Sequence, residues 1–302
     1  QRDHEGDRRP RRRTTTDVTP ASHRFDAGSW SLAVYDWGGD GPPVLLAHAT
    51  GFHGRIWAPV VAELLARGRR VWSFDFHGHG DSDAPDIDYS WHGFADDVLA
   101  VARHVGVHGD PSLIAAGHSK GGASLFLGAV KDPDAFARIW AFEPIVFRWD
   151  RDITPDDVPL AVSARKRRAI FASRDEAYER YASRPPLAAM TPESLRAYVD
   201  YGFRDLPDST VELKCAPEVE ARVFSMGPQH GVYERLGEVT VPVRVVCGET
   251  SQSITPALGE IIAQRLPRGT FEMQPGAGHF GPQQDPAWTA ESILHTGVDS
   301  HR

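Results

Sequence analysis

Apolar and polar positions divide most of the chain into short strand-like runs and longer helix-like segments. An opening hairpin is indicated by the alternating runs 22–28 and 30–39. Further apolar runs, each of strand length, follow at 42–49, 69–76, 112–119, 137–145, 241–249 and 269–275. Helical patterns lie between them, as at Phe94, Val98, Val101 and Val105, which share one face. This alternation predicts a mostly parallel, eight-stranded α/β sheet with helices on both faces.

The pattern changes between about Val146 and Leu236. Helical segments follow one another there, and no run has the character of a buried strand. Ser173 with Glu176 predicts a capping box, and Thr191 before Pro192 predicts another helix start. We therefore expect an α/β core at 21–145 and 237–302, interrupted by a helical cap or lid at 146–236. The polar, Arg-rich residues 1–20 are predicted to be a disordered tail.

Composition narrows the class of protein. The net charge is −8 and the pI about 5.9, which disfavours a nucleic-acid binder. The 33 basic residues include four Lys, which leaves 29 Arg, and we interpret this excess as compositional bias. The two Cys residues lack metal-site spacing, and no apolar run is long enough for a membrane span. We expect a cytoplasmic protein that acts on a small molecule, with no metal, cofactor, nucleic-acid or membrane partner; the sequence does not indicate an oligomeric state.

The sequence Gly-His-Ser-Lys-Gly at 117–121 carries the strongest chemical signal. It follows an apolar strand and opens a helix, which is the context of a nucleophile elbow. A sharp strand-to-helix turn would present the hydroxyl of Ser119, while the flanking glycines leave room for the crossing of the two elements. Ser119 is therefore the predicted nucleophile.

Two other loops follow predicted strands. In His-Ala-Thr-Gly-Phe at 48–52, the backbone N–H of Thr50 could form an oxyanion hole together with the N–H of Lys120. We expect His48 to brace that loop. In Gly-Ala-Gly-His-Phe at 276–280, His279 lies after the last strand and before the last helix, where it could act as the base for Ser119.

Together these motifs resemble the α/β-hydrolase superfamily, in its cap-bearing branch. The resemblance covers the chain from about Ala21 to its end, the cap being the least specific part. It implies an α/β-hydrolase fold and a catalytic triad in the order serine, acid, histidine. On this resemblance Ser119 corresponds to the nucleophile and His279 to the base.

The acid departs from the common pattern of that superfamily. Ser251 occupies the position, after the strand at 241–249, where Asp is usual. Glu143 ends an apolar strand, and a carboxylate there is costly unless it is paired. Some family members, including many haloalkane dehalogenases and the zearalenone lactonases, place a Glu at this strand end. We predict Glu143 as the acid, with Glu249 as second choice, and a purely structural role for both as a third possibility.

The identity of the nucleophile favours acyl transfer. Haloalkane dehalogenases and epoxide hydrolases of this fold carry Asp where this chain has Ser119, which disfavours an alkyl-enzyme. We predict hydrolysis of an ester or lactone through an acyl-enzyme. Hydrolysis of a carbon–carbon bond in a diketone and cofactor-free perhydrolysis stay open, and so does a small-molecule receptor on a hydrolase scaffold.

Candidate substrate-binding residues come from the motifs and from the cap. Those chosen are Phe52, His118, Phe147, Trp149 and Phe280. The cap also carries Tyr178, Tyr181, Tyr198 and Tyr201, any of which could line an apolar pocket or simply pack cap helices. The substrate itself is not specified by these residues.

Overall fold

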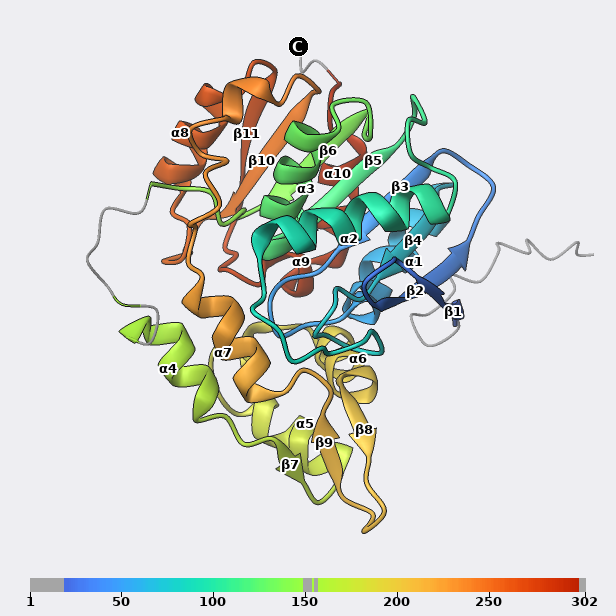
Figure 1. The fold of residues 1–302 in the computed structure, drawn as a ribbon, viewed down its shortest axis with the longest axis vertical. Helices are drawn as coiled ribbons and strands as arrows, with labels where there is room; N and C mark the ends of the chain where they lie inside the picture. The colour runs from blue at the N-terminus through green and yellow to red at the C-terminus, as the bar shows by residue number, and fades with distance from the viewer. Residues whose placement is uncertain (1–18, 149–153, 155–156, 299–302) are drawn as a thin grey trace, which may run out of the picture.

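The computed structural model describes residues 19–148, 154 and 157–298, and among these residues eight strands form one central sheet (Figure 1). Their order across the sheet is β1-β2-β4-β3-β5-β6-β10-β11. The first two pairings are antiparallel and the remaining five are parallel. The strands are β1 Ala21–Asp26, β2 Ser31–Gly38, β3 Pro43–Ala47, β4 Arg70–Phe74, β5 Ile114–His118, β6 Arg138–Phe142, β10 Val243–Gly248 and β11 Gly269–Gln274. The predicted hairpin and mostly parallel sheet are confirmed.

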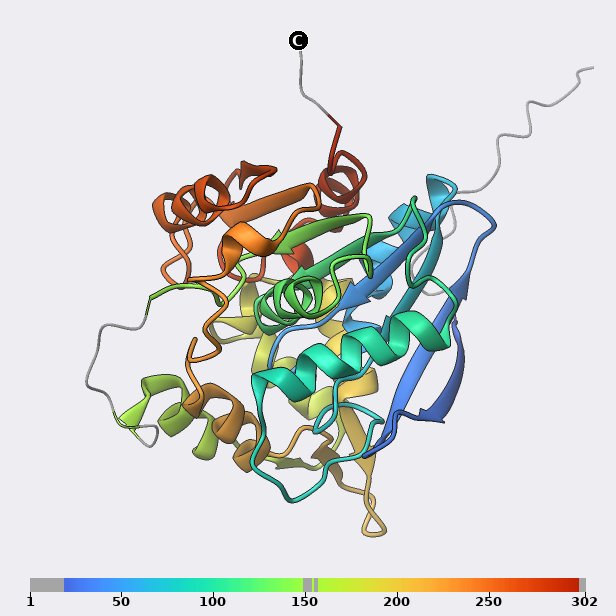
Figure 2. The ribbon, with the colours of Figure 1, turned by 45° about the horizontal axis from the view of Figure 1, so that its top comes forward.

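Helices cover both faces of this sheet (Figure 2). On one face, α2, α3 and α8 bury residues such as Val98, Phe126 and Ile262 in a shared core. On the other, α1 and α10 bury residues such as Val61, Leu64 and Ile293. The bounds are α1 Ala58–Ala66, α2 Trp91–His104, α3 Lys120–Lys131, α8 Pro256–Arg265, α9 Gly281–Gln284 and α10 Pro286–Leu294, with short 3-10 helices η2 Gly54–Trp57 and η5 Leu236–Glu238.

The segment between β6 and β10 forms a separate group of elements, below the sheet in Figure 1. Ser173 and Thr191 each cap a helix as predicted, because each side chain accepts a hydrogen bond from the N–H three residues on. The return contact of the predicted capping box is shifted by one residue, since the Glu176 carboxylate accepts from the Ala172 N–H at 2.7 Å. The segment contains α4 Pro159–Arg165, β7 Ile170–Phe171, α5 Arg174–Ala182, η4 Leu187–Ala189, α6 Pro192–Gly202, β8 Phe203–Asp205, β9 Val211–Leu213 and α7 Pro217–Ser225.

The expectation that this segment contains helices alone is wrong. Strands β7, β9 and β8 pair antiparallel in a small sheet. Each has two or three residues, too few to show a period of two in the sequence. Phe171, Phe203 and Leu213 from these strands are buried, so the small sheet contributes to the packing of the segment.

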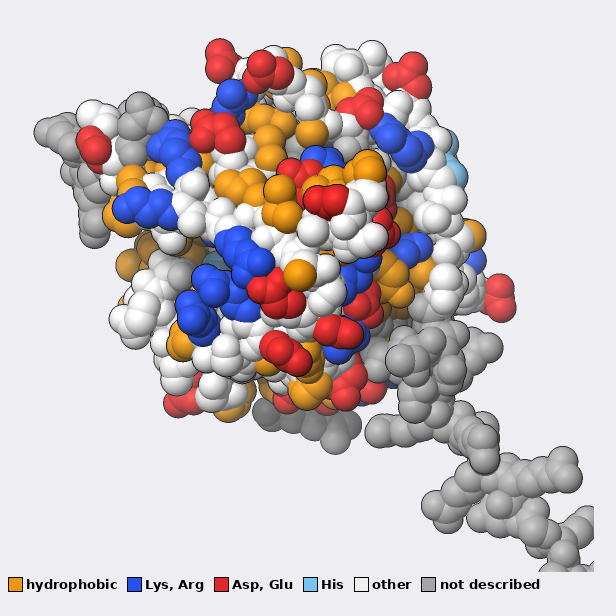
Figure 3. All heavy atoms as spheres, turned by 90° about the horizontal axis from the view of Figure 1, so that it is seen from below, with side chains coloured by type: hydrophobic (Ala, Val, Ile, Leu, Met, Phe, Trp, Pro, Cys, Tyr) orange, Lys and Arg blue, Asp and Glu red, His pale blue; other side chains and the backbone are white. Residues whose placement is uncertain are grey.

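Some predictions concern parts of the chain outside this description. The predicted disordered tail at 1–20 falls mainly on residues 1–18, and Trp149 lies outside the described residues as well. Within the described residues, no helix combines the length and the apolar character that crossing a bilayer requires. Figure 3 shows the molecule from the end that carries the inserted segment, where a group of Lys and Arg side chains lies left of the centre.

Candidate active site

Ser119 lies in the turn between β5 and α3. Its φ of 55° and ψ of −112° place a non-glycine residue in a sparsely populated backbone region. The turn is held by a hydrogen bond of 2.8 Å from the Ser119 N–H to the Phe142 carbonyl. Strain retained at one residue of a rigid turn is the backbone geometry of a nucleophile elbow.

The glycines around Ser119 are required by close approach of the backbone. A Cβ on Gly117 would lie 2.5 Å from the Gly121 carbonyl carbon, and a Cβ on Gly121 would lie 2.3 Å from the Ala47 carbonyl oxygen. Neither contact can be relieved by a side-chain rotation, because both partners are backbone atoms. The predicted function of these glycines, room for the strand and helix to cross, agrees with this packing.

Glu143 directly follows β6 and is fully buried. Its φ of 44° is also unusual for a non-glycine residue. One carboxylate oxygen, Oε1, accepts a hydrogen bond of 3.0 Å from the Gly248 N–H. The other, Oε2, accepts one of 2.8 Å from the Ser251 hydroxyl. These donors offset the cost of burying a carboxylate in an apolar strand end.

His279 follows β11 and faces the same carboxylate. Its Nδ1 lies 2.6 Å from Glu143 Oε2. A carboxylate at Nδ1 favours the tautomer with the proton on that nitrogen, which leaves Nε2 available as a base. Glu249, the second choice for the acid, instead accepts a hydrogen bond of 2.7 Å from the Gly276 N–H. Glu143 is therefore the carboxylate that contacts His279.

The two candidate oxyanion donors flank Ser119 from different elements. Thr50 lies in the loop between β3 and η2, followed by Gly51 with a φ of 75°. Lys120 is the first residue of α3, and the N–H groups in the first turn of a helix have no partner within that helix. His48 braces the loop as expected, because its Nε2 accepts a hydrogen bond of 3.1 Å from the Phe76 N–H.

The side chain of Lys120 is a feature that sequence reasoning missed. It is fully buried, with Nζ 3.3 Å from His79 Nε2 and 4.1 Å from the centre of the Phe76 ring. Burial lowers the pKa of Lys120 to about 7. Burial likewise holds the pKa of His79 well below its ordinary range. A polar cluster with reduced charge thus lies behind the candidate oxyanion loop.

A cavity of about 970 Å³ lies between the core and the inserted segment. Its wall includes two of the three predicted catalytic residues, Ser119 and His279, together with Thr50, Phe52 and Phe280, all named from the sequence. From the inserted segment it includes Leu160, Ser163, Ala164, Arg167, Arg180, Tyr181, Arg184, Pro185, Pro186, Leu187, Ala188, Ala189, Tyr198, Glu220 and Phe224.

Two other predicted substrate-binding residues are not part of that wall. His118 is fully buried beneath the site, with its ring centre 4.9 Å from that of His279. Its ring packs beneath the wall, against the rings of Phe52 and Phe280. Phe147 packs against the core cluster on the α2, α3 and α8 face. Neither side chain is among the described residues of the cavity wall, and a role of these two residues in substrate binding stays a prediction.

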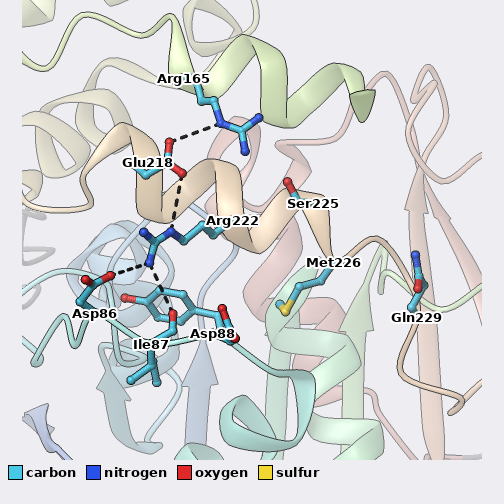
Figure 4. A pocket seen from close by; sticks show the side chains of 10 residues that line it. Asp86, Ile87, Asp88, Arg165, Glu218, Arg222, Ser225, Met226 and Gln229 are labelled. Carbon is cyan, nitrogen blue, oxygen red and sulfur yellow. Dashed lines mark hydrogen bonds and ion pairs between the residues drawn. The ribbon is translucent and has the colours of Figure 1, made fainter. Parts of the chain in front are cut away.

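A second cavity, of about 750 Å³, lies between residues 86–89 and α7 (Figure 4). Arg222 crosses it and pairs with Asp86 at 2.8 Å, and Glu218 contacts both Arg222 and Arg165. None of the predicted catalytic residues lines this cavity. In the described part of the chain, no three His, Cys, Asp or Glu side chains are grouped to hold a metal ion.

Comparison with known proteins identifies the family. Residues 44–292 match the model of the alpha/beta hydrolase family. The chain is 28% identical over 284 residues to 2-(acetamidomethylene)succinate hydrolase from Mesorhizobium japonicum, covering 91% of this chain and 94% of the relative. It is 30% identical over 283 residues to a bifunctional esterase/perhydrolase from Acinetobacter calcoaceticus, covering 86% and 93%.

Comparison with solved structures shows the same fold. A crystal structure of E-2-(acetamidomethylene)succinate hydrolase superimposes with a TM-score of 0.78 at 23% sequence identity, covering 92% of this chain and 98% of that one. These relatives are hydrolases of the same architecture, and the family match spans most of the described core and the inserted segment. This chain is a hydrolase that belongs to the alpha/beta hydrolase family.

Proposed function

We propose that this protein hydrolyses a carboxylic ester or lactone through an acyl-enzyme on Ser119. The observation that carries the proposal is the 2.6 Å contact between His279 Nδ1 and Glu143 Oε2, made at the wall of the cavity that Ser119 also lines. It supports a Ser119–His279–Glu143 triad with the acid after β6.

In the proposed mechanism, His279 Nε2 takes the proton of the Ser119 hydroxyl as its oxygen attacks the carbonyl carbon. The N–H groups of Thr50 and Lys120 stabilise the oxyanion. His279 then gives the proton to the leaving alkoxide as the carbon–oxygen bond breaks. Water, deprotonated by His279, attacks the acyl-enzyme, and its collapse releases the acid and restores Ser119. Glu143 stabilises the imidazolium formed in both halves of the reaction.

The segment 146–236 acts as a lid in this proposal. Side chains of α4, α5, α6 and α7 supply one side of the cavity wall, while the turns that follow β3, β5, β10 and β11 supply the other. Ligands of open α/β sheets bind outside the carboxyl ends of the strands, and this cavity lies at those ends. Tyr181 and Tyr198, two of the cap tyrosines that the sequence offered as pocket residues, belong to that wall.

The decisive experiment combines covalent labelling with turnover. A fluorophosphonate probe should label the wild type and spare Ser119→Ala, and only the wild type should hydrolyse 4-nitrophenyl esters and small lactones. Equal labelling of both proteins would disprove the role of Ser119. Labelling of Ser119 without turnover of any ester, lactone or diketone would instead favour a receptor.

The similarity to an esterase/perhydrolase motivates one further experiment. Perhydrolysis uses the same acyl-enzyme but lets hydrogen peroxide replace water as the second nucleophile. Peracid formation from acetate and hydrogen peroxide, measured on the wild type and Ser119→Ala, tests this second candidate independently of ester turnover.

A further inference from the structure

Three arginines from the inserted segment line the cavity that contains Ser119 and His279. They are Arg167, Arg180 and Arg184, and Glu220 is the acidic residue among the described residues of the same wall. The remainder of the wall is mainly apolar or uncharged. A buried charge in such a wall needs a partner within the protein, whereas a solvent-exposed cation at its rim is available to a charged ligand.

Arg167 has its partner within the protein. Its guanidinium donates a hydrogen bond of 2.6 Å to Glu220 and one of 2.7 Å to the Tyr198 hydroxyl. Glu220 is buried, so this ion pair is shielded from water and neutralises both charges. Arg167, which follows α4, therefore forms a fixed structural pair with Glu220 of α7.

Arg180 and Arg184 differ from Arg167. Within the described residues, neither guanidinium has a carboxylate within ion-pair distance, and both side chains are exposed. Glu176, one helical turn before Arg180, is already held by Arg168 through contacts of 2.5 Å and 3.0 Å. Two cations four residues apart repel each other, and here they face one cavity.

We propose that Arg180 and Arg184 form a subsite for a carboxylate, so that the substrate is an acyl compound with a second, free carboxylate. The inference rests on the proposed function, because it places the scissile carbonyl at Ser119. A planar carboxylate accepts paired hydrogen bonds from a guanidinium, which the ammonium of a lysine cannot donate in that geometry. The apolar part of the wall, including Phe52 and Leu187, then holds the carbon chain between the two ends.

A matched pair of esters tests the proposal. Mono-(4-nitrophenyl) glutarate carries the free carboxylate, and 4-nitrophenyl hexanoate has a similar chain without it. The ratio of kcat/KM for the first over the second should fall at least tenfold in Arg180→Gln/Arg184→Gln. It should stay within twofold of wild type in Arg204→Gln/Arg265→Gln, which removes the same charge away from the cavity. An unchanged ratio in the first variant would overturn the subsite.

Binding measured without turnover separates this proposal from the function itself. Glutarate should raise the Tm of Ser119→Ala, and the shift should disappear when Arg180→Gln/Arg184→Gln is added. If the wild type hydrolyses neither ester but glutarate still gives this Arg-dependent shift, the ester-hydrolase proposal fails and the carboxylate subsite stands. If inorganic phosphate stabilises the protein through these arginines and glutarate does not, the assignment to a carboxylate is wrong.

Discussion

The Ser251 hydroxyl donates a hydrogen bond of 2.8 Å to Oε2 of Glu143, the same oxygen that lies 2.6 Å from His279 Nδ1. Ser251 occupies the position where related hydrolases commonly carry their acid. In this chain that position therefore supports a carboxylate supplied by the neighbouring strand. We expect Ser251→Ala to lower kcat about tenfold, because a hydrogen bond to a charged group contributes about 1.5 kcal/mol. Steady-state kinetics with a 4-nitrophenyl ester would measure the change, and a rate equal to wild type would contradict it.

Glu143→Gln should be far more damaging than Ser251→Ala. An amide cannot stabilise the imidazolium, and loss of the acid in such triads costs on the order of 10⁴ in kcat. Glu249→Gln is the matched control, because that carboxylate contacts the Gly276 N–H rather than His279. It should retain activity within about threefold of wild type, consistent with a surface hydrogen bond. If the control were the inactive variant, the acid would be assigned wrongly.

The short distance between Ser251 and Glu143 suggests that the acid can be moved. Glu143→Ala/Ser251→Asp places a carboxylate at the position common in the superfamily, near the former Oε2 site. It should recover at least tenfold in kcat relative to Glu143→Ala. Glu143→Ala/Gln252→Asp adds a carboxylate at the next residue, which is exposed, and should recover nothing. Equal recovery in both variants would mean that added negative charge, and not contact with His279, restores the rate.

Gly121→Ala should destabilise the fold as well as abolish activity. The new methyl group would meet the Ala47 carbonyl oxygen at 2.3 Å, and backbone must move to relieve the contact. Overpacking of this kind costs about 3 kcal/mol. Gly237→Ala is the control, since nothing lies within 4 Å of its added Cβ. Urea unfolding of the two variants and the wild type gives the comparison, and similar midpoints for all three would refute the steric argument.

The buried Lys120 predicts a pH-dependent stability. Its folded pKa of about 7 lies below the ordinary value of 10.5, so between these values the unfolded chain binds more protons than the folded one. This group therefore makes the protein more stable as pH rises from about 7 towards 10.5, and its cost is fully present below that window. Lys120→Met removes the cost and keeps the backbone N–H.

Lys120→Met should accordingly be more stable than the wild type at pH 6.5, by on the order of 2 kcal/mol. The difference should shrink at pH 8 and again at pH 9.5. Urea unfolding at the three pH values measures it. A stability difference that stays constant with pH would show that Lys120 does not titrate in this window. A difference that grows with pH would contradict a lowered pKa of Lys120.

Local patterns made the fold and most of the candidate site predictable. Ser119 and His279 each lie between a strand and a helix, so their places in the fold are specified by sequence neighbours. Glu143 could be inferred because a carboxylate in an apolar strand needs a partner. The sequence does not show that Ser251 is a donor to it, since that contact joins residues 108 positions apart.

The inserted segment was less predictable for physical reasons. Its strands are too short to show a period, and an exposed arginine such as Arg180 has no local signature that separates a cavity wall from a solvated surface. Because the chain has many arginines and we interpreted them as compositional bias, the arginines that line the cavity could not be recognised from the sequence. His118 is next to Ser119 in sequence, but its ring packs beneath the wall, against Phe52, His279 and Phe280.

The proposed position of the acid, directly after β6, has a consequence for how this enzyme can be re-engineered. The proposed nucleophile and the proposed acid both belong to the continuous unit β5–α3–β6, in which the Ser119 N–H donates a hydrogen bond to the Phe142 carbonyl. With Glu143 as the acid, the loop after β10 does not need to carry a charged catalytic residue. Ser253, in that loop, belongs to the cavity wall, so it offers a position for saturation libraries that alter substrate preference while the triad stays intact.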